Sequence, residues 1–136
     1  MVTKQGRFIR NLDALGELFE LLGAFAAEAS LSVEVEAELT VAIEELFVNA
    51  VRHSVGRRGD IRVRLTRVDD RIEICLIDEG VEPFDTTAAS LPDLNVPIDR
   101  RQTGGMGLHI VRQFADELTY SHENGNGIIT LRKRLR

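Results

Sequence analysis

Apolar residues recur at intervals of three and four along two stretches in the first half of the chain. One stretch begins at Asn11 or Asp13, and the other runs from Ser32 to about Ser54. This spacing is typical of helices with one apolar face, and Asn, Asp and Ser are residue types that cap helix N-termini. The pattern therefore predicts two amphipathic helices. Their apolar stripes are Leu12, Leu15, Leu18, Phe19, Leu22 and Phe25 in the first helix, and Leu39, Ala42, Ile43, Leu46 and Ala50 in the second.

Alternating apolar and polar positions predict strands in the remaining segments. "IRVRLTRV" and "RIEICLID" are joined at Asp69 and Asp70 and are typical of an antiparallel hairpin. Residues 3–10 are expected to form a short edge strand, and "LTYSHENGNGIITLRKRLR" is expected to form a closing hairpin about "NGNG".

The segment between the two hairpins has a different character. Residues 79–103 contain all three prolines and no sustained period, which predicts a long functional loop. After "TGGMG", the spacing of Leu108, Val111, Ala115 and Leu118 predicts a third helix. Helices and antiparallel strands without regular strand–helix alternation favour the α+β class. We expect a two-layer sandwich with a mixed or mostly antiparallel sheet and helices on one face.

Size and charge narrow the class of protein. With 136 residues, 43% of them apolar, the chain is expected to form one domain with a single core. A net charge of -5 is unfavourable for general binding of nucleic acid. No stretch approaches the ~18 apolar residues of a membrane span and the N-terminus lacks a signal-peptide pattern, so we expect a cytoplasmic location. The single cysteine, Cys75, excludes an internal disulfide and any site with several thiolates.

The second helix carries polar residues beside its apolar stripe. At about 100° per residue, Glu45, Asn49 and His53 align along one flank of that stripe. Burying an amide without a partner costs about 1–3 kcal/mol, so Asn49 requires a neighbouring loop, water or a ligand. His53 is also suited to capping the helix end as a cation.

A carboxylate ends the second predicted strand. Asp78 shares the core-facing side of that strand with Ile72, Ile74 and Leu76. It can cap the following turn, or it can accept a hydrogen bond from an amino group of a ligand. Gly80 permits close approach of the backbone at this point.

"TGGMGLHIV" joins a glycine cluster directly to a helix N-terminus. Such a junction suits a phosphate group, although a tight turn has the same composition. It is not a P-loop or a dinucleotide fingerprint, because no Lys-Ser/Thr pair follows it and no strand leads into it. An amino-group acceptor, a phosphate site and an Asn carbonyl suited to Mg²⁺ together predict a nucleotide site.

Three segments resemble the signature boxes of the GHKL, or Bergerat-fold, ATP-binding superfamily. "EELFVNAVRHS" is similar to its N-box, and "DEGVEPFD" and "TGGMGLHIV" are similar to its first and second glycine boxes. The chain most resembles the small anti-sigma factor serine kinases of the RsbW and SpoIIAB type. Glu82 stands where many superfamily members carry a second glycine, a departure shared with these kinases.

The resemblance implies roles for particular residues. Asn49 would coordinate Mg²⁺, and Glu45 would be the catalytic base. Asp78 would accept an adenine amino hydrogen, with help from Gly80. Backbone amides of the second glycine box would contact the phosphates of ATP. That box comprises Gly104, Gly105, Met106, Gly107 and Leu108.

Three further assignments follow from the resemblance. Thr130, in the last strand, matches a position where many relatives place a Thr near the adenine. Residues 86–103 would form the ATP lid. Arg100 or Arg101 could reach the phosphates from that lid.

The resemblance implies an Mg·ATP-dependent serine/threonine kinase that phosphorylates an anti-sigma factor antagonist and binds a sigma factor. Homodimers are common in that family. The alternatives are an ATP-binding module that switches partners without phosphorylating them, and a kinase with another target. A metal hydrolase is disfavoured because His53, His109 and His122 show no ligand spacing.

Overall fold

The computed structural model describes residues 1–52, 59–80 and 111–135. In these ranges the chain forms five strands, two α-helices and a 3₁₀ turn, and residues 111–114 are helical. The elements are β1 (Val2–Phe8), η1 (Leu12–Ala14), α1 (Leu15–Glu28), α2 (Val33–Arg52), β2 (Ile61–Val68), β3 (Arg71–Glu79), β4 (Glu117–Glu123) and β5 (Asn126–Arg134).

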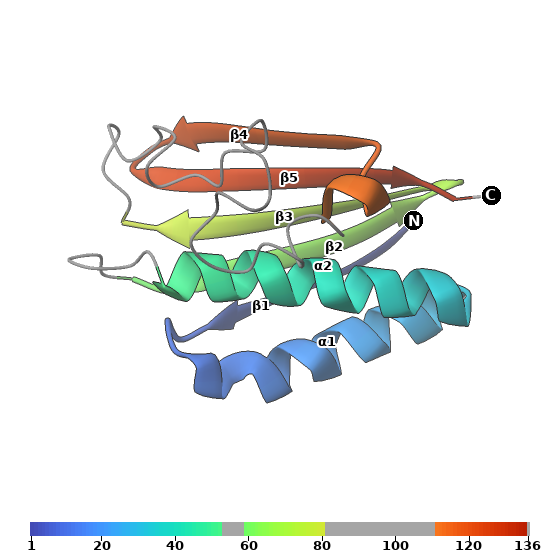
Figure 1. The fold of residues 1–136 in the computed structure, drawn as a ribbon, viewed down its shortest axis with the longest axis horizontal. Coiled ribbons are helices and arrows are strands. Elements are labelled where there is room, and N and C mark those ends of the chain that lie inside the picture. The colour runs from blue at the N-terminus through green and yellow to red at the C-terminus, as the bar shows by residue number, and fades with distance from the viewer. Residues whose placement is uncertain (53–58, 81–110, 136) are drawn as a thin grey trace.

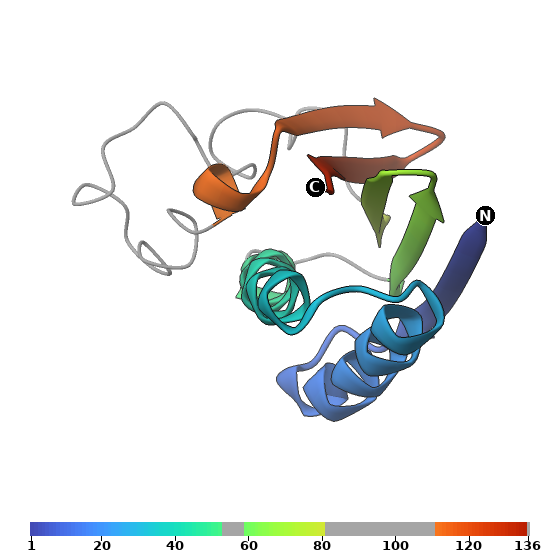
Figure 2. The same ribbon diagram turned by 90° about the vertical axis from the view of Figure 1, so that its right-hand side faces the viewer.

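The strands form one antiparallel sheet in the order β1-β2-β3-β5-β4. Figure 1 and Figure 2 show α1, α2 and the turn at residues 111–114 on the same face of this sheet. The predicted two-layer α+β architecture, with helices covering one face, is confirmed. Both predicted hairpins and the edge strand β1 are also confirmed.

The helix starts follow the capping residues. The Asn11 side-chain oxygen accepts a hydrogen bond from the Asp13 backbone N–H at 2.8 Å, and the first helix opens as a 3₁₀ turn. Ser32 Oγ accepts from the Val35 backbone N–H at 3.1 Å, which satisfies one of the unpaired donors at the start of α2. Within the described ranges, no helix combines the length and apolar character needed to cross a membrane.

The hairpin turns use residues that tolerate positive φ. Asn124 and Gly125 have φ of 54° and 79°, as a two-residue turn of the I′ type requires between β4 and β5. Asp69, between β2 and β3, has φ of 54°. These turns fix the strand register, and that register determines which side chains face the helices.

The core lies between the sheet and the helices. Ile61, Val63 and Leu65 of β2 are at most 1% exposed and face helix residues such as Phe47, which is fully buried. Burying each large apolar side chain stabilises the fold by roughly 1.5–3 kcal/mol. Phe8 extends the cluster to the end of β1, where its ring meets that of Phe47 edge-on with centroids 6.2 Å apart.

The third predicted helix ends earlier than its apolar spacing indicates. Val111 and Phe114 are buried in the core, and the Ala115 N–H closes the last helical turn on the Val111 carbonyl. Leu118 was expected both on the helix stripe and at the start of the closing hairpin, and it lies in β4 opposite Leu131. The Asp116 N–H already bonds to the Arg132 carbonyl, so pairing with β5 replaces the helix there. Leu108 lies outside the described residues.

Candidate functional site

Two buried polar side chains lie where the helix layer meets one end of the sheet. Asn49 is 6% exposed and Asp78 is 8% exposed, and they are the buried polar residues of the described part of the chain. Asp78 follows Ile72, Ile74 and Leu76 on the helix-facing side of β3. Figure 1 shows the C-terminal ends of α2 and β3 at the same end of the molecule. The fold therefore turns both side chains toward the space between the two layers.

The polar atoms on α2 point to a ligand. Asn49 Nδ2 and Glu45 Oε1 are buried and have no hydrogen-bond partner in the described residues. An unsatisfied buried donor or acceptor costs about 1–3 kcal/mol. The Asn carbonyl oxygen suits Mg²⁺ and the amide N–H suits an anionic oxygen, so this donor set fits a magnesium-bound phosphate group.

Glu45 lies one helical turn before Asn49 and is partly buried. Desolvation by burial raises the pKa of its carboxyl group above the ordinary 4.5. The nearby positive charge of Arg52 opposes this shift and the negative charge of Glu44 adds to it. Glu44 itself is exposed, as its position on another face of the helix predicts. A carboxyl group with a raised pKa is a better proton acceptor, which suits a general base.

Asp78 is paired with an arginine that follows β1, the strand two positions away from β3 in the sheet. Arg10 Nη1 lies 2.5 Å from Asp78 Oδ1, and the two side chains are 8% and 12% exposed. Arg10 Nη2 also donates to the Glu79 carbonyl at 2.9 Å. No local sequence pattern predicts the position of Arg10, because only the strand order and the register Phe8–Ile61–Asp78 bring the end of β1 to the end of β3.

Glu79 anchors the opposite face of the same strand end. Its carboxylate contacts Arg7 Nη1 at 2.6 Å and Arg62 Nε at 3.0 Å, and it accepts from the Asp60 backbone N–H at 3.2 Å. Burial alone would raise the pKa of Glu79, but the Asp60 hydrogen bond and the two arginine charges outweigh it. The pKa therefore lies below the ordinary 4.5.

This network gives a stability prediction. Glu79→Gln is expected to destabilise the fold at pH 7 by roughly 1 kcal/mol, because two ion pairs are lost. A carboxyl whose pKa is lowered on folding stabilises above its unfolded pKa, and this contribution is lost as pH falls through the folded value. The difference from wild type, measured by urea unfolding, should therefore shrink at pH 3. An equal difference at pH 7 and pH 3 would contradict this assignment.

Of the other predicted site residues, the structure describes Gly80 and Thr130. Gly80 is exposed with φ of 75°, a conformation that glycine adopts at no steric cost. The second glycine box (Gly104, Gly105, Met106, Gly107 and Leu108), the lid, Arg100, Arg101, His53 and His109 lie outside the described residues.

The strand register corrects the prediction that Thr130 lies near the adenine. It pairs with Cys75 in the β3–β5 register, and its Oγ1 lies 3.7 Å from the Cys75 sulfur. Cys75 and Asp78 are three residues apart in one strand, so their side chains point to opposite faces of the sheet. Thr130 therefore faces away from the layer that holds Asp78, and Ile129 takes the helix-facing position.

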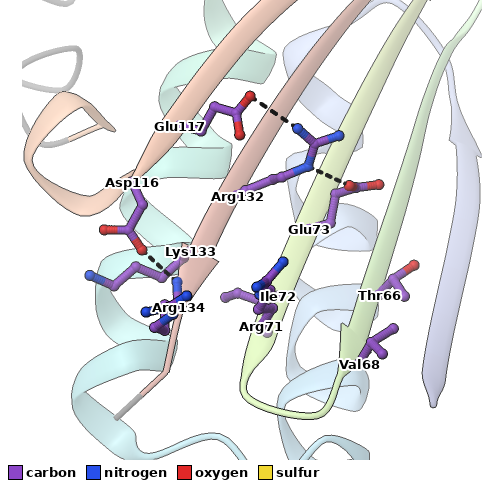
Figure 3. Close-up of a pocket in the computed structure, with 10 residues that line it drawn as sticks. All are labelled: Thr66, Val68, Arg71, Ile72, Glu73, Asp116, Glu117, Arg132, Lys133 and Arg134. Atoms are coloured by element: carbon purple, nitrogen blue, oxygen red, sulfur yellow. Dashed lines mark hydrogen bonds and ion pairs between the residues drawn. The ribbon is translucent and has the colours of Figure 1, made fainter.

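A cavity of about 640 Å³ lies at the other end of β3 from Asp78. Figure 3 shows its charged lining, in which the Arg132 guanidinium bridges Glu73 at 2.8 Å and Glu117 at 3.1 Å. Hydrogen bonds to Glu73 and Glu117, together with their charges, raise the pKa of Arg132. Lys133 lies over the Phe114 ring at 5.5 Å from its centroid. Two basic side chains of β5, Arg132 and Lys133, thus lie against carboxylates and an aromatic ring respectively.

Known proteins resemble this chain in sequence. A 31% identical relative is the serine-protein kinase RsbW of Staphylococcus epidermidis, matched over 77% of this chain and 69% of its own length. The anti-sigma F factor of Caldanaerobacter subterraneus subsp. tengcongensis is 29% identical over 80% of this chain and 76% of its own length.

Solved structures share the fold at low sequence identity. The RsbU and RsbW domains of a Mycobacterium tuberculosis protein match with a TM-score of 0.70 and 20% identity over 99% of this chain, which spans 32% of that structure. A chain of the SiaB–SiaC complex from Pseudomonas aeruginosa matches with a TM-score of 0.62 and 13% identity, over 98% of this chain and 89% of that one. The histidine kinase-like ATPase domain family matches residues 8–133, and the chain belongs to this family.

Proposed function

We propose that this chain binds Mg·ATP and transfers the terminal phosphoryl group to a Ser or Thr of an anti-sigma factor antagonist. In its nucleotide-bound form it would sequester a sigma factor. Family membership supports ATP as the nucleotide. Relatives named serine-protein kinase RsbW and anti-sigma F factor support the reaction and the two classes of partner.

One observation carries the proposal within the structure. Asn49 and Asp78 are buried on facing layers at the same end of the fold, and Asn49 Nδ2 and Glu45 Oε1 have no hydrogen-bond partner among the residues that the structure describes. Polar groups at Asn49 and Glu45 are expensive to bury without a ligand. Adenine with a polyphosphate chain supplies an amino group for Asp78 and anionic oxygens for Asn49.

Each residue has a proposed part in the reaction. Asp78 accepts a hydrogen bond from the adenine amino group, and the carbonyl oxygen of Asn49 would hold the metal ion. Bound Mg²⁺ would neutralise charge on the phosphates, which is the main need of phosphoryl transfer. Glu45 takes the proton of the attacking hydroxyl group as its oxygen bonds to the γ-phosphorus, while the bond from that phosphorus to the β–γ bridging oxygen breaks and ADP leaves. Backbone amides of Gly105 and Gly107 remain the predicted phosphate contacts.

The proposal is tested by measuring transfer of labelled phosphate from ATP to an antagonist protein. The purified chain is incubated with γ-labelled ATP, Mg²⁺ and candidate antagonist proteins of the same genome, and label on a Ser or Thr of one antagonist is the expected result. ATP binding without transfer to any antagonist would instead favour a module that changes partners with nucleotide state.

Co-purification of the ATP-bound chain with a sigma factor tests the second partner. The mass of the same complex shows whether the chain forms a homodimer.

A further inference from the structure

Arg10 is a buried cation that the proposed reaction does not yet use. It lies two residues beyond β1, and its side chain crosses the end of β2 to reach β3, two strands away in the sheet. Only 8% of the side chain is exposed. Burying a charge costs several kcal/mol unless a partner compensates it, so the Arg10–Asp78 pair is a built feature of this strand end.

The contact pairs the two charges at one oxygen of Asp78. Arg10 Nη1 and Asp78 Oδ1 lie 2.5 Å apart. The guanidinium is also fixed by its Nη2 hydrogen bond to the Glu79 carbonyl. A carboxylate offers about four lone-pair directions on two oxygens, so this pairing does not exhaust the acceptor capacity of Asp78.

An adjacent guanidinium favours the ionised form of a carboxylate. An ionised carboxylate can only accept hydrogen bonds, whereas a protonated one can also donate. At position 6, adenine presents an amino donor and hypoxanthine presents an oxo acceptor. Arg10 thus fixes the property of Asp78 that distinguishes these two bases.

We propose that Arg10 is a positioning residue that holds Asp78 as an acceptor and so makes the site select 6-amino over 6-oxo purine nucleotides. This inference rests on the proposed function, because it assumes that Asp78 faces the base. It adds a specificity residue from the segment that follows β1, outside the three segments that resemble the family's boxes.

The test compares ATP with inosine 5′-triphosphate, which carries an oxo group at position 6. Affinities of the full chain for both nucleotides are measured by calorimetry for wild type, Arg10→Met and Arg10→Lys. Wild type should prefer ATP, Arg10→Met should lower that preference about tenfold, and Arg10→Lys should retain most of it. The ratio of the two affinities is the readout, because partial unfolding weakens both affinities by the same factor.

Arg7→Met is the matched control. Arg7 lies in β1, three residues before Arg10, and pairs with Glu79 on the other face of the sheet, so its loss should leave the nucleotide preference unchanged. The proposal would be overturned if Arg10→Met kept the wild-type preference for ATP. It would also be overturned if Arg7→Met lowered the ratio of the two affinities as much as Arg10→Met does.

Arg10→Met leaves Asp78 as a buried charge without Arg10. If that variant does not fold, a second variant tests the proposal. The double variant Arg10→Met/Asp78→Asn removes both charges, and its Asn amide can either donate or accept. It is expected to bind the two nucleotides equally, and a retained ATP preference would overturn the inference. Wild type that binds neither nucleotide would instead refute the proposed function, whereas wild type that binds both equally would refute this inference and the proposed adenine contact of Asp78 but would leave the proposed phosphoryl transfer standing.

Discussion

Asp78→Asn is expected to weaken ATP binding about 10- to 100-fold. The substitution keeps the size of the side chain but removes the negative charge that accepts the adenine amino hydrogen. Hydrogen bonds to charged groups contribute about 1.5–3 kcal/mol, and each 1.4 kcal/mol is a factor of ten in affinity. Isothermal titration with ATP measures the change directly.

Glu79→Gln is the matched control for Asp78→Asn. It neutralises the next carboxylate along β3, whose side chain lies on the other face of the sheet, and ATP affinity should stay within about twofold of wild type. Asp78→Asn leaves Arg10 without its ionic partner and is expected to lower the stability of the fold. The titrations are therefore run at a temperature below the thermal unfolding transition of the variant, which circular dichroism measures. A folded Asp78→Asn protein that binds ATP as tightly as wild type would remove Asp78 from the site.

Glu45→Gln is expected to lower the rate of phosphoryl transfer by about 10²- to 10⁴-fold, the usual contribution of a general base. ATP affinity should change little, because the proposed role of Glu45 is to take the proton of the attacking hydroxyl group. Single-turnover transfer of labelled phosphate to the antagonist separates the chemical step from binding.

Glu44→Gln is the control for that experiment. Glu44 is the exposed neighbour of Glu45 and should be dispensable for transfer. If Glu45→Gln transferred phosphate at the wild-type rate, or if Glu44→Gln showed the same loss, the assignment of the base would be wrong.

The raised pKa of Glu45 also fixes the sign of two pH effects. A base acts in its ionised form, so the wild-type transfer rate should rise with pH through a pKa above 4.5, and Glu45→Gln should lack this rise. A carboxyl whose pKa is raised on folding destabilises the fold once it ionises. Glu45→Gln should therefore be at least as stable as wild type at pH 7, and this advantage should vanish below pH 4.5.

Local patterns were sufficient to predict most of the elements. The α2 helix begins after Ser32, the residue whose hydroxyl caps it, and the β4–β5 turn falls on Asn124 and Gly125, which tolerate positive φ. These signals lie within a few residues of the feature that they determine. Burial of Asn49 beside the core stripe of α2 follows from the helical period in the same way.

Features that depend on distant pairing could not be predicted. Arg10 reaches Asp78 only because β2 lies between β1 and β3, an order that no local pattern specifies. Thr130 was predicted to lie near the adenine, but the side chain of its neighbour Ile129 is the one that faces the helices. In a strand, a shift of one residue reverses the face of the sheet. Leu118 fits the helical spacing, but pairing with β5 decided its conformation.

The most direct test of the account is ATP affinity with and without Mg²⁺, for wild type and for Asn49→Ala. It addresses the central claim that the end of α2 and the end of β3 form one Mg·ATP site. Wild type should bind ATP more tightly when Mg²⁺ is present, and Asn49→Ala should lose most of that gain. Equal affinity in all four titrations would contradict the account, because Asn49 and the metal would then have no part in binding.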